Sequence, residues 1–232
     1  MIMNDKILWT FGDSFLASEA NYISHYKTIT DCSKVKIYAK PGSSLQYLLE
    51  TILKTKKLIR PHHHLLIGIP GPLRGYYKNN HYCNHELFDA SNDLMSDKDL
   101  ERDHLAIASH LINDIIPSIK CDNVKIFTTV ENECYNNYEY LPSMYCIREH
   151  IVNHIQTKLD IKSSKNIFKR KRDREYIEKL INRPPNHIPF EFEKDLSVEI
   201  VEHINSVKDQ IVPLKQFEFD TLKIHQQDVK IL

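Results

Sequence analysis

Short apolar runs alternate with amphipathic stretches along the first half of the chain. Three runs have the length of a strand, and each ends in a turn that contains glycine: Lys6–Phe11 before Gly12, Val35–Ala39 before Gly42, and His64–Ile69 before Gly71. Between the second and third runs, residues 45–58 place apolar side chains with the 3.6-residue period of a helix. Strands that alternate with helices predict a parallel sheet covered on both faces.

The pattern continues beyond residue 98. A fourth run, Val124–Val130, follows a helical stretch from about Asp99 to Ile116, which Pro117 ends. The other elements that the pattern predicts are helices at about Ser143–Leu159, Asp173–Ile181 and Lys194–Gln210 and a fifth, edge-like strand at Asn166–Phe168. We therefore expect a three-layer α/β/α sandwich whose parallel sheet has about five strands in a flavodoxin-like order.

Length and composition narrow the class of protein. With 232 residues, 41% of them hydrophobic and 27% charged, the chain is neither disordered nor a disulfide scaffold. We expect one domain over residues 1–210 and a C-terminal extension over 211–232, which is a candidate for pairing at a sheet edge or with a second copy of the chain. The 31 basic and 31 acidic residues cancel, so we expect no nucleic-acid partner.

Membrane and secretion signals are missing from the sequence. No window approaches 18 consecutive apolar residues, and Met1–Lys6 has no apolar segment of the secretory type. The five cysteines are odd in number and scattered. Together these features predict a cytoplasmic protein with reduced thiols and no membrane partner.

The candidate chemistry lies at the glycine turns. All five glycines fall in the first third of the chain, and in an open parallel sheet ligands bind beyond the carboxyl ends of the strands. Ser14 directly follows the first strand and precedes a helix start, where amides are free to stabilise an oxyanion. Gly42 can bring a second amide to the same place without a Cβ in the way. A serine beside two amide donors is an arrangement suited to acyl transfer.

At these residues the chain resembles a known family. Phe11-Gly12-Asp13-Ser14-Phe15 is similar to the nucleophile block of the SGNH, or GDSL-type, hydrolases. The resemblance implies that Ser14 is the nucleophile, that Asp13 braces its turn and that Gly42 is an oxyanion donor. Pro184–Pro189 stands where the family has its last block, which makes His187 the general base. The resemblance extends over about residues 6–210.

Two positions depart from the family. Pro70 replaces the Asn that donates to the oxyanion, and Pro184 replaces the Asp that orients the catalytic His. Losing one side-chain oxyanion donor costs ~10²–10³ in rate, and a missing triad acid costs up to ~10⁴. Arg74 is a candidate substitute donor. Glu191 or a backbone carbonyl near Pro184 is a candidate for orienting His187.

The resemblance predicts a serine ester hydrolase with a Ser14–His187 dyad and no cofactor. Its substrate would be a carbohydrate ester, as in deacetylation, or another short acyl ester. The alternative is a non-catalytic SGNH-like binding or structural protein. Pro70 and Pro184 favour that alternative, whereas the presence of both Ser14 and His187 favours the enzyme.

Several of these residues also have simpler interpretations. Ser14 and Asp13 are suited to capping a helix, and Gly42 to a tight turn. His62–His64 and the His81-x-Cys83-x-His85 pattern are possible metal ligands, but neither has a carboxylate or a Cys pair at ligand spacing, and we expect no metal. The basic run Lys169–Arg172 fits a solvated helix better than a phosphate site at zero net charge.

Overall fold

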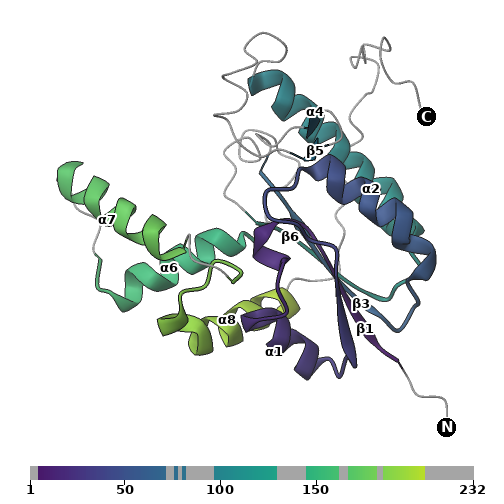
Figure 1. Cartoon of the computed structure of the whole chain (residues 1–232), viewed down its shortest axis with the longest axis horizontal. Helices are drawn as coiled ribbons and strands as arrows, with labels where there is room; N and C mark the ends of the chain where they lie inside the picture. Colours follow the sequence, from purple (N-terminus) through teal and green to yellow (C-terminus); the bar gives the residue numbers. More distant parts are fainter. Residues whose placement is uncertain are drawn as a thin grey trace.

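A four-stranded, all-parallel sheet forms the centre of the protein (Figure 1). The computed structural model describes residues 5–71, 76–77, 80–81, 97–129, 145–161, 167–181 and 185–206. The strands are β1 (Ile7–Phe11), β2 (Lys34–Ile37), β3 (His64–Ile69) and β6 (Asn123–Thr128). Their order in the sheet is β2-β1-β3-β6. A parallel sheet was predicted, and this order is the beginning of a flavodoxin-like one.

The two faces of the sheet carry separate apolar cores. Successive side chains of a strand point to opposite faces, so Trp9 and Phe11 of β1 enter one core while Leu8 enters the other. In β3, Leu65 and Ile67 share the face of Trp9, and Leu66 shares that of Leu8. The central strands are therefore apolar on both sides, as expected for strands covered by helices.

Helices α2 (Leu45–Thr55) and α4 (Asp97–His110) cover the face of Trp9 (Figure 1). The Oγ of Ser44 caps α2 by accepting a hydrogen bond from the Tyr47 amide at 3.3 Å. After α4 the chain continues through a π turn, η3 (Leu111–Ile115), and a 3₁₀ turn, η4 (Ile116–Ser118). The predicted helices over residues 45–58 and 99–116 are therefore confirmed, apart from these changes of helix type at their ends.

The opposite face is covered by α1 (Asn21–Ile29), α6 (Ile147–Lys158), α7 (Ile167–Ile181) and α8 (Glu193–Ser206). In Figure 1 α1 and α8 lie side by side on the opposite side of the sheet from α2 and α4, and α6 and α7 extend from them. The remaining short elements are η1 (Ser14–Leu16), η2 (Lys56–Leu58), η5 (Phe190–Phe192) and the antiparallel pair β4 (Tyr76–Tyr77) and β5 (Asn80–His81).

The expected count of about five strands is wrong for the parallel sheet among the residues that the structure describes, which has four. Of the segment predicted as the fifth strand, Ile167 and Phe168 begin α7 instead, and Asn166 lies outside the described residues. Ile177 and Ile181, one helical turn apart, are buried in the core, and the helix that they anchor extends back to Ile167. The C-terminal extension, 211–232, lies outside the described residues.

The strand order reverses beside Ser14. From β1 the chain goes to β2 on one side of the sheet, and from β3 it goes to β6 on the other. The carboxyl ends of β1 and β3 thus meet at the point where the strand order reverses, which is where open α/β sheets bind ligands. Ser14 follows β1 at this point. No helix among the described residues is long and apolar enough to cross a membrane.

Candidate active site

The turn after β1 is tightly packed against β3. Gly12 has φ +152°, and a Cβ there would lie 2.8 Å from the Gly68 carbonyl oxygen and 2.9 Å from Leu16 Cδ1. Only glycine fits this close approach without displacing the backbone of β3. Gly12 therefore allows the chain to turn sharply and place Ser14 at the start of η1.

Asp13 braces this turn from inside the protein. Its Oδ1 accepts a hydrogen bond from the Phe15 amide at 3.1 Å, which caps η1. Its Oδ2 accepts a second from Thr129 Oγ1 at 2.7 Å. Both side chains are completely buried, and Thr129 directly follows β6. The Asp13 carboxylate therefore links the Ser14 turn to the carboxyl end of β6.

The structure brings Ser14 and His187 together, although 173 positions separate them in the sequence. Ser14 Oγ lies 2.5 Å from His187 Nε2, and His187 Nδ1 lies 2.7 Å from the carbonyl oxygen of Ile181. A carbonyl only accepts hydrogen bonds, so Nδ1 carries the proton. In the neutral ring Nε2 is then the acceptor, and the Ser14 hydroxyl donates to it.

Ring stacking also holds the imidazole in place. The rings of Phe15 and His187 stack with centroids 4.2 Å apart and an angle of 29° between their planes. Phe15 is itself buried, and its carbonyl accepts a hydrogen bond from the buried hydroxyl of Tyr22. Burial raises the pKa of Tyr22 well above its usual value, so the phenol remains a donor at neutral pH.

The Gly42 turn lies against the Ser14 turn. The carbonyl of Gly12 accepts hydrogen bonds from the Lys40 amide at 3.0 Å and from Ser43 Oγ at 2.7 Å, which places residues on both sides of Gly42 next to it. Gly42 has φ +76°, a left-handed conformation that favours glycine. Within the described parts of the chain, the amides of Ser14 and Gly42 donate to no other group. Both remain available for an oxyanion.

The structure describes only some of the other predicted site residues. Pro70 is buried directly after β3 and has no amide hydrogen to donate. Arg74 and Pro184 lie outside the described residues. Of the two candidates for orienting His187, the hydrogen bond of Nδ1 goes to a backbone carbonyl near Pro184, that of Ile181, and not to Glu191, which is exposed. Glu191 lies in η5 and makes no hydrogen bond or ion pair with another residue that the structure describes.

Two contributors to the site were not identified as individual residues by the sequence analysis. The Ile181 carbonyl, at the C-terminal end of α7, is a backbone carbonyl near Pro184 of the kind expected, but the sequence does not single it out because every residue carries one. Thr129 did have a signal, since it is a polar residue at the carboxyl end of a predicted strand. Such residues face the same edge of the sheet as Ser14.

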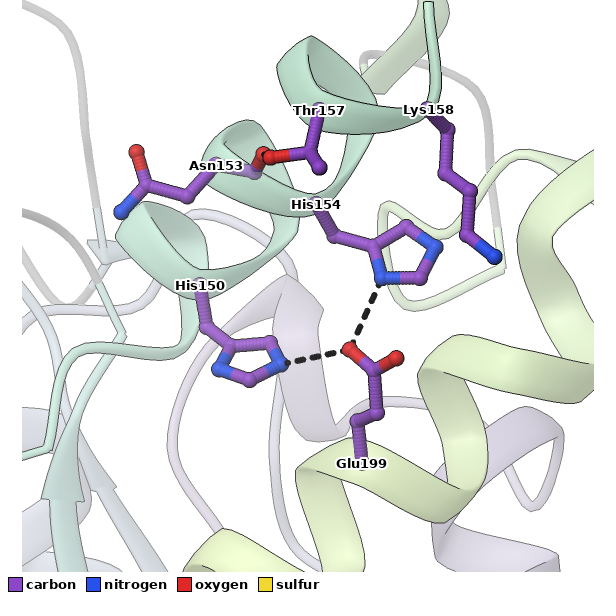
Figure 2. Close-up of a pocket in the computed structure, with 6 residues that line it drawn as sticks. All are labelled: His150, Asn153, His154, Thr157, Lys158 and Glu199. Atoms are coloured by element: carbon purple, nitrogen blue, oxygen red, sulfur yellow. Dashed lines mark hydrogen bonds and ion pairs between the residues drawn. The ribbon is translucent and has the colours of Figure 1, made fainter.

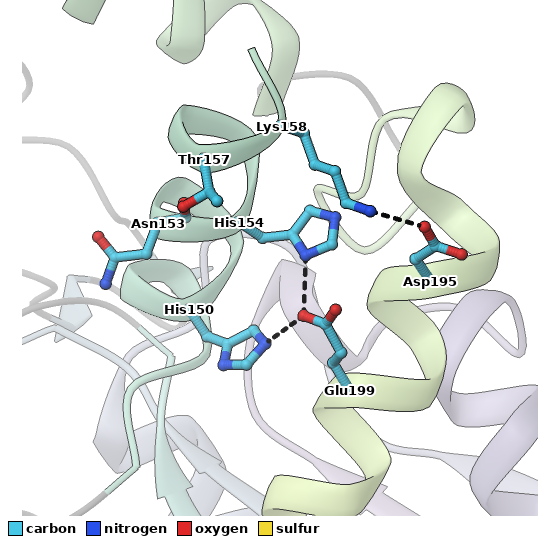
Figure 3. Close-up of polar contacts among 7 residues, drawn as sticks. All are labelled: His150, Asn153, His154, Thr157, Lys158, Asp195 and Glu199. Carbon is cyan, nitrogen blue, oxygen red and sulfur yellow. Dashed lines mark hydrogen bonds and ion pairs between the residues drawn. The ribbon is translucent and has the colours of Figure 1, made fainter. Parts of the chain in front are cut away.

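A second polar cluster lies between α6 and α8 (Figure 2). The cavity of about 280 Å³ is lined by His150, Asn153, His154, Thr157, Lys158 and Glu199. Glu199 Oε2 accepts a hydrogen bond from His154 Nδ1 at 2.8 Å and lies 3.4 Å from His150 Nε2. Figure 3 adds the ion pair between Lys158 and Asp195 at 3.1 Å. These contacts join α6 to α8.

Among the histidines singled out as metal ligands, His63 has two hydrogen-bond partners within the protein. His63 Nδ1 accepts hydrogen bonds from Trp9 Nε1 at 3.0 Å and from the Arg60 amide at 3.1 Å, and burial lowers its pKa. Of the pattern from His81 to His85, only the backbone of His81 is described. Among the residues with described side chains, no group of three or more His, Cys, Asp or Glu is spaced to hold a metal ion.

Comparison with known proteins adds no family. No protein-family model matches the chain, and no curated protein matches it. The interpretation of the site therefore depends on its geometry and on the sequence resemblance described above.

Proposed function

We propose that this protein is a serine ester hydrolase of the SGNH type, with Ser14 as nucleophile and His187 as general base. The observation that carries the proposal is the chain of two hydrogen bonds, from Ser14 Oγ to His187 Nε2 and from His187 Nδ1 to the Ile181 carbonyl. Nucleophile, base and a third group that orients the base are the three parts that activated serines share.

In the proposed reaction, Ser14 Oγ attacks the acyl carbon while its proton moves to His187 Nε2. The amides of Ser14 and Gly42 hold the oxyanion of the tetrahedral intermediate. Collapse of the intermediate breaks the bond to the alcohol, which leaves with the proton from Nε2. Water then repeats the sequence on the acyl-serine and releases the acid and free Ser14.

The Ile181 carbonyl replaces one of the two contributions of a triad carboxylate. Replacing that carboxylate with an amide costs ~10⁴ in rate because it imposes the wrong imidazole tautomer. The Ile181 carbonyl can only accept a hydrogen bond, so the proton stays on Nδ1. This tautomer leaves Nε2 free to take the serine proton. Because the carbonyl is uncharged, it stabilises the imidazolium less than a carboxylate does. The proposed enzyme is therefore slower than a full triad enzyme but not inactive.

The proposed substrate is an acetylated carbohydrate or another short acyl ester, as the family resemblance implies. Pro70 supports the second candidate, a binding protein that retains the fold of a hydrolase, because the position of the family's oxyanion Asn has no donor here. The same experiment separates the two candidates.

The test is covalent labelling with a fluorophosphonate, read by intact mass and peptide mapping. We expect one adduct on Ser14, none in Ser14→Ala, and a strongly slowed reaction in His187→Ala. Ser206→Ala, a serine on the exposed end of α8, is the matched control and should label like the wild type. Hydrolysis of p-nitrophenyl acetate is the second readout and should depend on Ser14 and His187 in the same way. A folded protein that neither labels nor hydrolyses the ester would refute the enzyme and favour the binding protein.

A further inference from the structure

The loop that carries His187 is fastened to the segment that follows Ser14. Asn186 Nδ2 donates hydrogen bonds to the carbonyls of Ser18 and Ala20, both at 3.1 Å. In return, Asn21 Nδ2 donates to the carbonyl of Pro185 at 3.0 Å. We call these three hydrogen bonds the asparagine clasp. They join two segments that lie more than 160 positions apart in the sequence.

The clasp is buried and has one orientation. Asn186 is 3% exposed and Asn21 is 7% exposed. A flipped Asn186 amide would turn its oxygen towards two carbonyl oxygens, so the placement of Nδ2 is determined by its partners. The Oδ1 of Asn186 is buried without a partner among the described residues. The side chain therefore acts only as a donor, and its hydrogen bonds go to the segment behind Ser14.

The clasp also holds an unusual backbone. Asn186 and His187 have φ +51° and +60°, so two consecutive residues other than glycine are left-handed. L-residues adopt this region at a cost, although Asn tolerates it better than most. The Ile188 amide closes the turn on the Pro185 carbonyl at 3.2 Å. The side-chain hydrogen bonds of Asn186 thus stabilise the backbone conformation that turns His187 towards Ser14.

We propose that Asn186 and Asn21 are positioning residues for His187, and that the clasp supplies the placement that a triad carboxylate provides in other serine hydrolases. In this arrangement the clasp holds the ring where Nδ1–H reaches the Ile181 carbonyl, which sets the tautomer, and where Nε2 meets Ser14 Oγ. The effect on catalysis rests on the proposed function, whereas the effect on the imidazole does not.

Two variants remove, in different ways, the two hydrogen bonds that Asn186 donates to the clasp. Asn186→Gly deletes the side chain and keeps a residue that accepts a positive φ. Asn186→Asp keeps the shape, removes both donors and directs a carboxylate at the two carbonyls. Asn153→Asp, the same change at an exposed residue of α6, is the matched control. Long-range ¹H–¹⁵N spectra report the tautomer of His187, whose signals are assigned by their loss in His187→Ala.

We expect the wild type and Asn153→Asp to show the Nδ1–H tautomer, and both Asn186 variants to show averaging between tautomers. Because a misplacement of about 1 Å costs ~10² in rate, the labelling of Ser14 and kcat should fall ~10–10²-fold with little change in KM. Wild-type spectra and labelling rates in folded Asn186→Gly would overturn the clasp. Absence of labelling in the wild type would refute the proposed function instead, and the spectra would still decide the role of Asn186.

Discussion

Gly68 in β3 tests how the Ser14 turn is packed. A Cβ on Gly68 would lie 2.3 Å from Leu16 Cδ1 and 2.6 Å from Thr129 Cγ2. Both neighbours are completely buried, and Thr129 also donates the hydrogen bond that holds Asp13. Distances this short require the neighbours to move, so the methyl group of Gly68→Ala must displace Leu16, Thr129 or both.

The expected cost follows from overpacking of a buried site, which destabilises proteins by about 1–3 kcal/mol. For a chain of this size each kcal/mol lowers Tm by about 2–4 °C, so we expect a decrease of roughly 2–12 °C. Thermal unfolding followed by circular dichroism measures it. Fluorophosphonate labelling of Ser14 at a temperature where the variant is fully folded should also slow, because Leu16 and Thr129 both adjoin the Ser14 turn.

A double-mutant cycle makes the test specific. Leu16→Ala alone should cost about 2–5 kcal/mol through the cavity that it leaves. In the double variant the methyl group at position 68 occupies part of that cavity. The destabilisation of the double variant should therefore be smaller than the sum of the two single variants by about 0.5–3 kcal/mol. Strict additivity, or a Gly68→Ala protein as stable as the wild type, would refute the packing argument.

Two further predictions concern histidines. Glu191→Gln should leave ester hydrolysis unchanged, because His187 Nδ1 bonds to the Ile181 carbonyl, whereas His187→Ala should remove most of it. A loss of ~10²-fold in Glu191→Gln would restore Glu191 as the orienting group. Burial lowers the pKa of His104 to about 3. Between pH 6.5 and 3 the unfolded chain therefore binds a proton at this residue and the folded chain does not. The free energy of unfolding should fall as the pH drops through this range, by up to the order of 5 kcal/mol. Urea unfolding at several pH values should show this slope, and His104→Leu should reduce it; an equal slope in both proteins would contradict the assignment to His104.

The local features of the fold could be predicted from the sequence because they depend on near neighbours. The apolar runs and the helical period over residues 45–58 follow from which side chains can be buried on a pleated strand or one face of a helix. Ser14 at the carboxyl end of β1 followed from the same pattern and a glycine turn. Where a short segment carried no such period, as at Ile167 and Phe168, burial of Ile177 and Ile181 further along α7 decided its structure.

The tertiary structure alone decided which groups complete the site. That Ser14 and His187 lie near one another was expected from a resemblance, but the sequence left two candidates for the group on the far side of the imidazole, Glu191 and a backbone carbonyl near Pro184. It is the Ile181 carbonyl at the C-terminal end of α7, and the sequence does not distinguish one carbonyl from another. The left-handed turn at Asn186 and His187 directs the ring towards Ile181 and Ser14, whereas Glu191, the more conspicuous candidate in the sequence, is exposed in η5.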